Sequence, residues 1–335
     1  DGSIDVAGRI RRDGDNPFSY DLTASLKNVA LTFDQCPYAL EDVVGELRLR
    51  PEAIEIRNLV GRHGPGRIDV TGRVDGDLAA GEPPAVEIRG AGVRVDEALR
   101  RAVVTAGPPG VEDVWTQLQP TGIADFVWNP HREVSLEVVA RDMGITFAPF
   151  PYPLRQVRGT VLVRRDRIDL EGITAARDGG SLKLDGTVRV GGGRLREADL
   201  VLDATGVAIT EELLASVPRP LRVLTDHLSP GGRFDVSLSR LRFNDSEPVT
   251  APATADAAAG GGPSWTWEVD GSVHLDDAVA TGTFEATAIR AGIAGSVRID
   301  DARDALSVDA ALTALLGEGR HAVLTADAGP DQVDT

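Results

Sequence analysis

Apolar and polar residues alternate along most of this chain. Residues 66–74 read G-R-I-D-V-T-G-R-V, which places the aliphatic residues and both glycines on one side and Arg, Asp and Thr on the other. The same alternation recurs over 43–49, 182–190 and 200–204. Such a pattern is typical of β-strands with one buried and one solvated face. The sequence therefore predicts a mainly β protein.

Turn signals separate the predicted strands. Short runs rich in Asp and Gly stand at 12–15, 75–77, 178–180 and 191–193. Because the strands that they connect follow closely on one another, the spacing predicts antiparallel hairpins that continue as a meander.

Helical pattern is scarce. Residues 96–104 and 210–217 each open with an Asp or Thr that can cap a helix and continue with acidic residues in the first turn. Weaker patterns predict helices over 111–119 and 220–228. Residues 245–264 are rich in Ala, Gly, Pro and Thr without periodicity, which predicts a flexible insertion.

The chain contains an internal repeat. Residues 33–45 match residues 147–159 without a gap as F-x-x-x-P-Y-x-L-x-x-V-x-G, at an offset of 114. The same offset carries Gly92 onto Gly206, so both predicted helices fall at the same point of their repeats. A degraded third copy follows the insertion. We therefore predict three repeats, at 1–110, 111–230 and 231–335, each of about six strands with a short helix in the first two.

Charge and chemistry exclude several function classes. Asp and Glu number 52 against 35 Lys and Arg, a net charge of −17, which argues against binding nucleic acid or an anionic membrane surface. Cys36 is the single cysteine, and no His or Cys spacing fits a metal site. The group at 274–277 is better explained as an acidic turn, and the group at 300–304 lacks the Gly and the closing Glu of an EF-hand loop. No nucleophile elbow or phosphate loop is present. We predict no catalysis, no metal and no cofactor.

The predicted helices are too few to cover the apolar face of each repeat. Four glycines at equivalent strand positions favour a strongly curved sheet, although Gly-rich composition alone is the competing explanation. We therefore predict a meander curved into an open, taco-like groove with a few short helices between repeats. The predicted bending glycines are Gly45, Gly72, Gly159 and Gly186. The predicted groove lining is Val43, Leu47, Leu49, Ile54, Ile56, Ile68, Val70, Val74, Val157, Val161, Val163, Ile168, Leu170, Leu182, Leu184 and Val188.

The segments P-Y-A-L-E-D-V-V-G-E-L (37–47) and P-Y-P-L-R-Q-V-R-G-T-V (151–161) resemble the AsmA-like (TamB-type) family of bacterial envelope proteins. The resemblance implies a β-groove protein that is anchored in the inner membrane and extends through the periplasm. It also implies phospholipid acyl chains and other envelope proteins as partners, in transport toward the outer membrane. The chain begins in strand-like sequence without Met, which we interpret as an excerpt of a longer protein.

Two other hypotheses remain open at this stage. A structural or adhesive spacer built of closed β-sandwiches would expose no apolar groove. A polysaccharide-active enzyme would gather acidic and aromatic residues in a cleft, where Trp115, Trp128, Trp265 and Trp267 are the residues to inspect.

Overall fold

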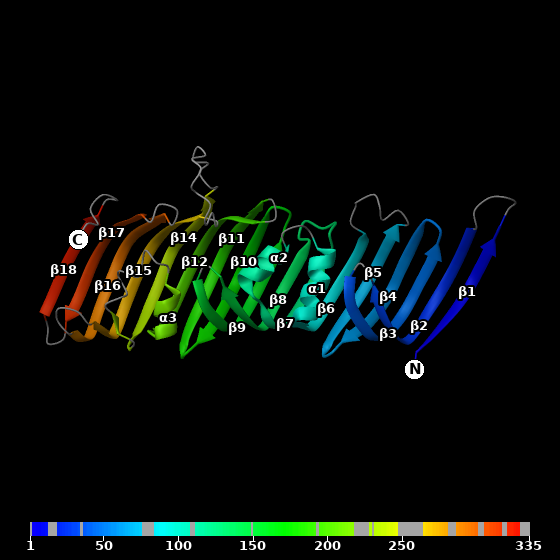
Figure 1. The fold of residues 1–335 in the computed structure, drawn as a ribbon, viewed down its shortest axis with the longest axis horizontal. Coiled ribbons are helices and arrows are strands. Elements are labelled where there is room, and N and C mark those ends of the chain that lie inside the picture. The colour runs from blue at the N-terminus through cyan, green and yellow to red at the C-terminus, as the bar shows by residue number, and fades with distance from the viewer. Residues whose placement is uncertain are drawn as a thin grey trace, which may run out of the picture. The chain divides into compact units, whose positions relative to one another are not determined.

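The computed structural model is a mainly β protein made of antiparallel meander with few short helices, as the alternation predicts (Figure 1). Contacts divide the chain into two compact units, the first containing 1–115, 120–144 and 158–165, the second containing 116–119, 145–157 and 166–335. The structure describes residues 2–12, 19–33, 36–75, 84–107, 111–148, 150–191, 194–217, 228–229, 231–246, 264–280, 286–300, 305–316 and 320–328.

In the first compact unit each strand pairs antiparallel with the next one along the chain, from β1 to β8. The elements are β1 (Ser3–Arg11), β2 (Ser19–Phe33), β3 (Cys36–Arg50), β4 (Ala53–His63), β5 (Gly66–Asp75), β6 (Ala85–Val95), α1 (Glu97–Ala106), α2 (Val111–Leu118), β7 (Thr121–Trp128) and β8 (Leu136–Phe147). The last residues of α2 and β8 belong to the second compact unit.

The second compact unit continues in the same manner, except that β12 pairs directly with β14 while the two-residue β13 pairs with β15. Its elements are β9 (Phe150–Val163, shared with the first unit), β10 (Arg167–Arg177), β11 (Gly180–Gly191), β12 (Arg194–Ala208), α3 (Glu211–Ser216), β13 (Leu228–Ser229), β14 (Arg233–Ser246), β15 (Ser264–Ala280), β16 (Ala286–Asp300), β17 (Ala305–Leu316) and β18 (Arg320–Ala328).

The predicted helix starts are confirmed. The Asp96 carboxylate accepts hydrogen bonds from the amides of Ala98 and Leu99, at 3.0 and 3.1 Å, and so caps α1. The Thr210 hydroxyl accepts from the Leu213 amide at 3.2 Å at the start of α3. The weaker pattern over 111–119 is α2. The helix predicted over 220–228 and the insertion predicted over 245–264 lie almost entirely outside the described residues.

The repeat extends to the backbone. At several strand positions the chain adopts a positive φ, and the register of the pairing with a neighbouring strand shifts nearby, which marks β-bulges. These positions recur at the same offset of 114 residues. The repeated pairs are Asp42 with Gln156, Asn58 with Gly172, and Gly92 with Gly206.

The predicted strong curvature is wrong, because the sheet is neither closed nor strongly curled. Gly45, Gly72, Gly159 and Gly186 instead have φ values of 147°, 138°, 132° and 146°. A Cβ on Gly72 would lie 2.2 Å from the Ala85 carbonyl oxygen, and one on Gly186 would lie 2.3 Å from that of Asp199. At these two positions glycine lets the backbone of the next strand approach closely, which requires no strong bend of the sheet.

The core of the first compact unit lies between the sheet and α1, which crosses one face of it (Figure 1). Helix α1 contacts β3 and β6, and its Leu99 packs against the buried cluster. That cluster comprises Leu26, Leu40, Val43, Leu59, Ile68 and Val93. The helix therefore covers only part of the apolar face.

Candidate functional site

The apolar face of the sheet in the first compact unit has a covered part and an uncovered part. Val43 and Ile68 are 0% and 4% exposed and belong to the core under α1. Leu47, Ile56 and Val70 are half-buried and pack against that core. These five predicted lining residues lie together, as the sequence indicated, but they form a packed core, which leaves no open surface at that point.

The remaining predicted lining residues on β3, β4 and β5 form one row across these three strands. Leu49 pairs with Ile54, and Ile54 pairs with Val74, so that all three side chains share the face that holds the core. Leu49 and Val74 are half-buried, and Ile54 is 39% exposed. This row is the part of the predicted lining that is most accessible to a ligand.

Strand β1 extends the same face, but the predicted lining did not include its apolar residues. Ile4 pairs with Leu26 and Val6 with Ala24, and both partners are buried on the core side. Ile4, Val6 and Ile10 are nevertheless 56%, 60% and 64% exposed. The alternating I-D-V-A-G-R-I at 4–10 carried the signal that could have found them. We call Ile4, Val6, Ile10, Leu49, Ile54 and Val74 the open apolar surface.

The second compact unit repeats the arrangement. Val157 and Val188 are 2% and 8% exposed, while the other predicted lining residues on β10 and β11 are half-buried. Those half-buried residues are Ile168, Leu170, Leu182 and Leu184, which share one face through the pairing of β10, β11 and β12. Val161 and Val163 are half-buried and lie in the part of β9 that belongs to the first compact unit, so they are not grouped with these residues.

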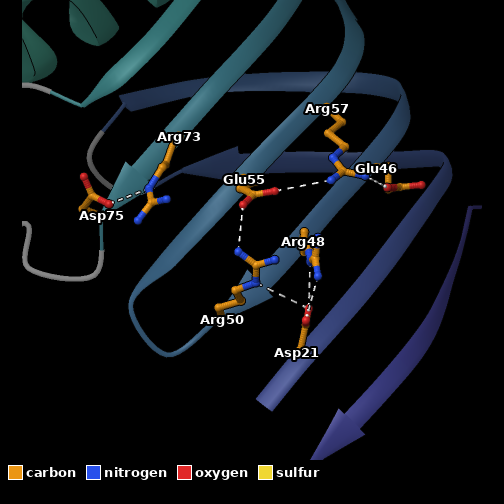
Figure 2. Close-up of polar contacts among 8 residues, drawn as sticks. All are labelled: Asp21, Glu46, Arg48, Arg50, Glu55, Arg57, Arg73 and Asp75. Atoms are coloured by element: carbon orange, nitrogen blue, oxygen red, sulfur yellow. Dashed lines mark hydrogen bonds and ion pairs between the residues drawn. The ribbon is translucent and has the colours of Figure 1, made fainter. Parts of the chain in front are cut away.

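The opposite face carries a network of ion pairs (Figure 2). Asp21 accepts hydrogen bonds from Arg48 at 2.7 and 2.8 Å, and Arg50 bridges Asp21 at 3.7 Å and Glu55 at 3.0 Å. Arg57 then lies 3.4 Å from Glu55 and 3.1 Å from a further carboxylate, that of Glu46 on β3. The hydrogen bonds from Arg48 lower the pKa of Asp21 from 3.8 to about 2. The sheet is thus apolar on one side and charged on the other.

Other chemistry is sparse in the part of the chain that the structure describes. There, no group of three His, Cys, Asp or Glu side chains could hold a metal ion. None of the helices described is long and apolar enough to cross a membrane. Trp115 and Trp128 are half-buried on α2 and β7, and the side chains of Trp265 and Trp267 lie outside what is described.

Comparisons with protein families, with curated proteins and with solved structures give no match to this chain. The AsmA-like resemblance therefore rests on the two P-Y-x-L segments and the strands that follow them.

Proposed function

We propose that this chain is a non-enzymatic segment of an AsmA-like cell-envelope protein that binds phospholipid acyl chains on the open apolar surface. The observation that carries the proposal is the exposure of Ile4, Val6, Ile10 and Ile54, at 39% to 64%, on the same face as the packed core. A surface of this kind on a repeat protein is a candidate binding site, since contiguous apolar patches are costly to leave in water.

The chemistry of the surface fits a flexible hydrocarbon. Its side chains are Val, Ile and Leu, which offer neither hydrogen bonds nor aromatic stacking. Each methylene transferred from water to such a surface contributes up to about 0.8 kcal/mol. An acyl chain would therefore gain affinity without a fixed position, while its headgroup stays in water. This property suits reversible binding of lipid on the uncovered part of the sheet and needs no cofactor.

The family resemblance supplies the cellular setting of the proposal. On that resemblance we propose that the parent protein lies in the periplasm, anchored in the inner membrane, with a role in intermembrane phospholipid transport or outer-membrane biogenesis. Other envelope proteins would then be its partners. The packed core under α1 interrupts the open apolar surface in the first compact unit, so we limit the proposal to lipid binding on the uncovered part.

The alternative function is a structural or adhesive spacer. The near-complete burial of Val43 and Val157 favours it, because these residues pack as in an ordinary core. The exposed side chains on β1 and β4 favour lipid binding over a closed sandwich, in which they would be covered.

Native mass spectrometry of the purified chain, followed by solvent extraction and lipid analysis, tests the proposal. Ile54→Asp and Val74→Asp place a charge on the open apolar surface, whereas Thr71→Asp places the same charge on the opposite face of β5. We expect co-purifying phospholipid that the first two variants lose and the third retains. Val70→Asp is a poor test, since Val70 packs against the core and its replacement would unfold the protein.

A folded, lipid-free chain would refute lipid binding and favour the spacer. Circular dichroism of each variant separates loss of lipid from loss of fold. A variant is used in the lipid comparison only if its spectrum matches that of the parent protein. Lipid retained by Ile54→Asp and Val74→Asp alike would equally contradict the proposed site.

A further inference from the structure

Successive repeats are joined by one particular strand pairing. In β6–β7, Gly90 pairs with Phe126 and Val93 with Ala124, with a bulge at Gly92 between them. In β12–β14 the equivalent partners are Ala204 with Val236 and Val207 with Phe234, around a bulge at Gly206. The two pairings have the same register, and we call each of them a strand junction.

An aspartate on the first strand of the following repeat secures each strand junction. The Gly92 amide donates a hydrogen bond to Asp125 Oδ1 at 2.8 Å, and the Gly206 amide donates to Asp235 Oδ1 at 2.6 Å. A bulge leaves a backbone donor outside the regular ladder, so the carboxylate satisfies a group that would otherwise lack a partner. In the first junction Arg141 Nε also donates to Asp125 Oδ2 at 2.7 Å.

Strand β1 has the sequence of a first strand. Residues 2–6 read G-S-I-D-V, against G-I-A-D-F at 122–126 and G-R-F-D-V at 232–236, which aligns Asp5 with Asp125 and Asp235.

The pairing with the next strand agrees with this alignment. Asp5 pairs with Ser25 as Asp125 pairs with Val139, and these partners stand 114 residues apart. Lys27 stands 114 residues before Arg141, and its Nζ donates to Asp5 Oδ2 at 2.7 Å. The aspartate and its basic partner are thus already assembled on β1 and β2.

The remaining half of a strand junction is absent at β1. Within the first compact unit, β1 pairs with β2 alone among the described strands. The Asp5 side chain is 66% exposed, against 22% for Asp125. Ile4 is 56% exposed, whereas its counterpart Ala124 between β6 and β8 is 4% exposed. An edge strand of this kind can accept a further strand.

We propose that the free edge of β1 binds the last strand of a further repeat of the same kind, which lies outside these 335 residues. The incoming strand would run antiparallel to β1 and carry the pattern of β6, V-E-I-R-G-A-G-V. The amide of its bulge glycine would donate to the Asp5 carboxylate. The chain's own β6 and β12 are already paired with β7 and β14, so they are not the occupants. This inference does not depend on lipid binding.

A synthetic peptide of residues 84–95, P-A-V-E-I-R-G-A-G-V-R-V, tests the proposal with the intact chain. Titration by fluorescence anisotropy should give saturable binding. Replacing Gly92 of the peptide with N-methylglycine removes only the bulge donor. Asp5→Ala in the protein removes the acceptor, and Glu52→Ala is the matched loss of one exposed carboxylate elsewhere. We expect the first two changes each to weaken binding at least about tenfold, as for a charge-assisted hydrogen bond, and Glu52→Ala to leave it unchanged.

The two changes act on one hydrogen bond, so their combination should weaken binding no further than either alone. Absence of saturable binding, or binding indifferent to both changes, would overturn the proposal. Self-association of the chain that Asp5→Ala abolishes would assign the edge to a second copy and overturn the proposed occupant. Lipid analysis of the same Asp5→Ala protein keeps the two proposals separate, because Asp5 points away from the open apolar surface.

Discussion

The guanidinium carbon of Arg177 lies 4.2 Å from the ring centre of Tyr152. The residues 114 positions earlier are His63 and Tyr38, whose ring centres are also 4.2 Å apart. Arg177 Nη1 donates to the Pro153 carbonyl, and His63 Nδ1 lies 2.7 Å from the carbonyl oxygen of Ala39. Two different side chains therefore fulfil one packing role, over the tyrosine of the P-Y-x-L segment. In both repeats that segment lies in the first residues of a strand, β3 or β9.

The two tyrosine hydroxyls lead to the first prediction. Among the described residues, the Tyr38 and Tyr152 hydroxyl oxygens are buried and have no hydrogen-bond partner. Burial raises the pKa of Tyr38 to about 12, so that hydroxyl stays neutral. Because an unsatisfied buried hydroxyl is destabilising, Tyr38→Phe and Tyr152→Phe should leave the free energy of unfolding unchanged or raise it by about 1 kcal/mol. Urea denaturation measures this.

The control for these variants removes the whole aromatic ring at one of the same two positions. Tyr152→Ala should cost about 3 kcal/mol or more, since it leaves a cavity and takes away the surface on which Arg177 lies. If Tyr152→Phe destabilised the protein by more than about 1 kcal/mol, the hydroxyl would have a partner and the argument would fail.

The second prediction separates two kinds of glycine. Gly72 has φ 138° and its added Cβ would meet the Ala85 carbonyl oxygen at 2.2 Å, whereas Gly172 has φ 57° and open space around it. Gly172→Ala then carries only the left-handed backbone cost of about 1–2 kcal/mol. Gly72→Ala adds a backbone clash and should lower the free energy of unfolding by about 3 kcal/mol or more. Thermal and urea unfolding of both variants measures which of them loses more free energy of unfolding.

Asn58 supplies an internal check on that order. It occupies the position of Gly172 in the earlier repeat and has φ 47°. Asn58→Gly should therefore be nearly neutral, because the strain it relieves is offset by the greater entropy of the unfolded chain. Equal losses for Gly72→Ala and Gly172→Ala would contradict the role of close strand approach.

Sequence alone predicted the strands and the helix starts, because each is written in a local pattern, whereas the repeat came from comparing segments 114 residues apart. The sequence analysis did not predict the β-bulges. At Asn58 the apolar positions step from Ile56 to Leu59, a spacing of three that keeps both side chains on the same face. That step was visible, but its backbone consequence depends on a left-handed residue that Asn and Asp adopt as well as Gly.

The open apolar surface was only partly predictable. Periodicity tells which face is apolar but not which part of it a helix covers, and so Val43 and Ile54 looked alike in the sequence. They are 0% and 39% exposed, because α1 lies over the first and not the second. The predicted curvature failed for a related reason, since a strand glycine reports close backbone approach as readily as a bend.

The third prediction concerns the response to acid. Arg48 lowers the pKa of Asp21 to about 2 in the folded protein, below its ordinary 3.8 in the unfolded chain. The stabilisation from Asp21 is therefore fully present above about pH 4 and is lost as the pH falls toward 2.

Asp21→Asn should be less stable than the parent at pH 6, and the difference should disappear near pH 2. Urea midpoints across this range measure it, and 0.5 M NaCl should shrink the difference because the pair is exposed. Asp5→Asn is the comparison, since the ion pair of Asp5 is with Lys27, at 2.7 Å, and not with an arginine. A difference between parent and Asp21→Asn that stays constant from pH 6 to pH 2 would show that the carboxylate charge contributes nothing to folding.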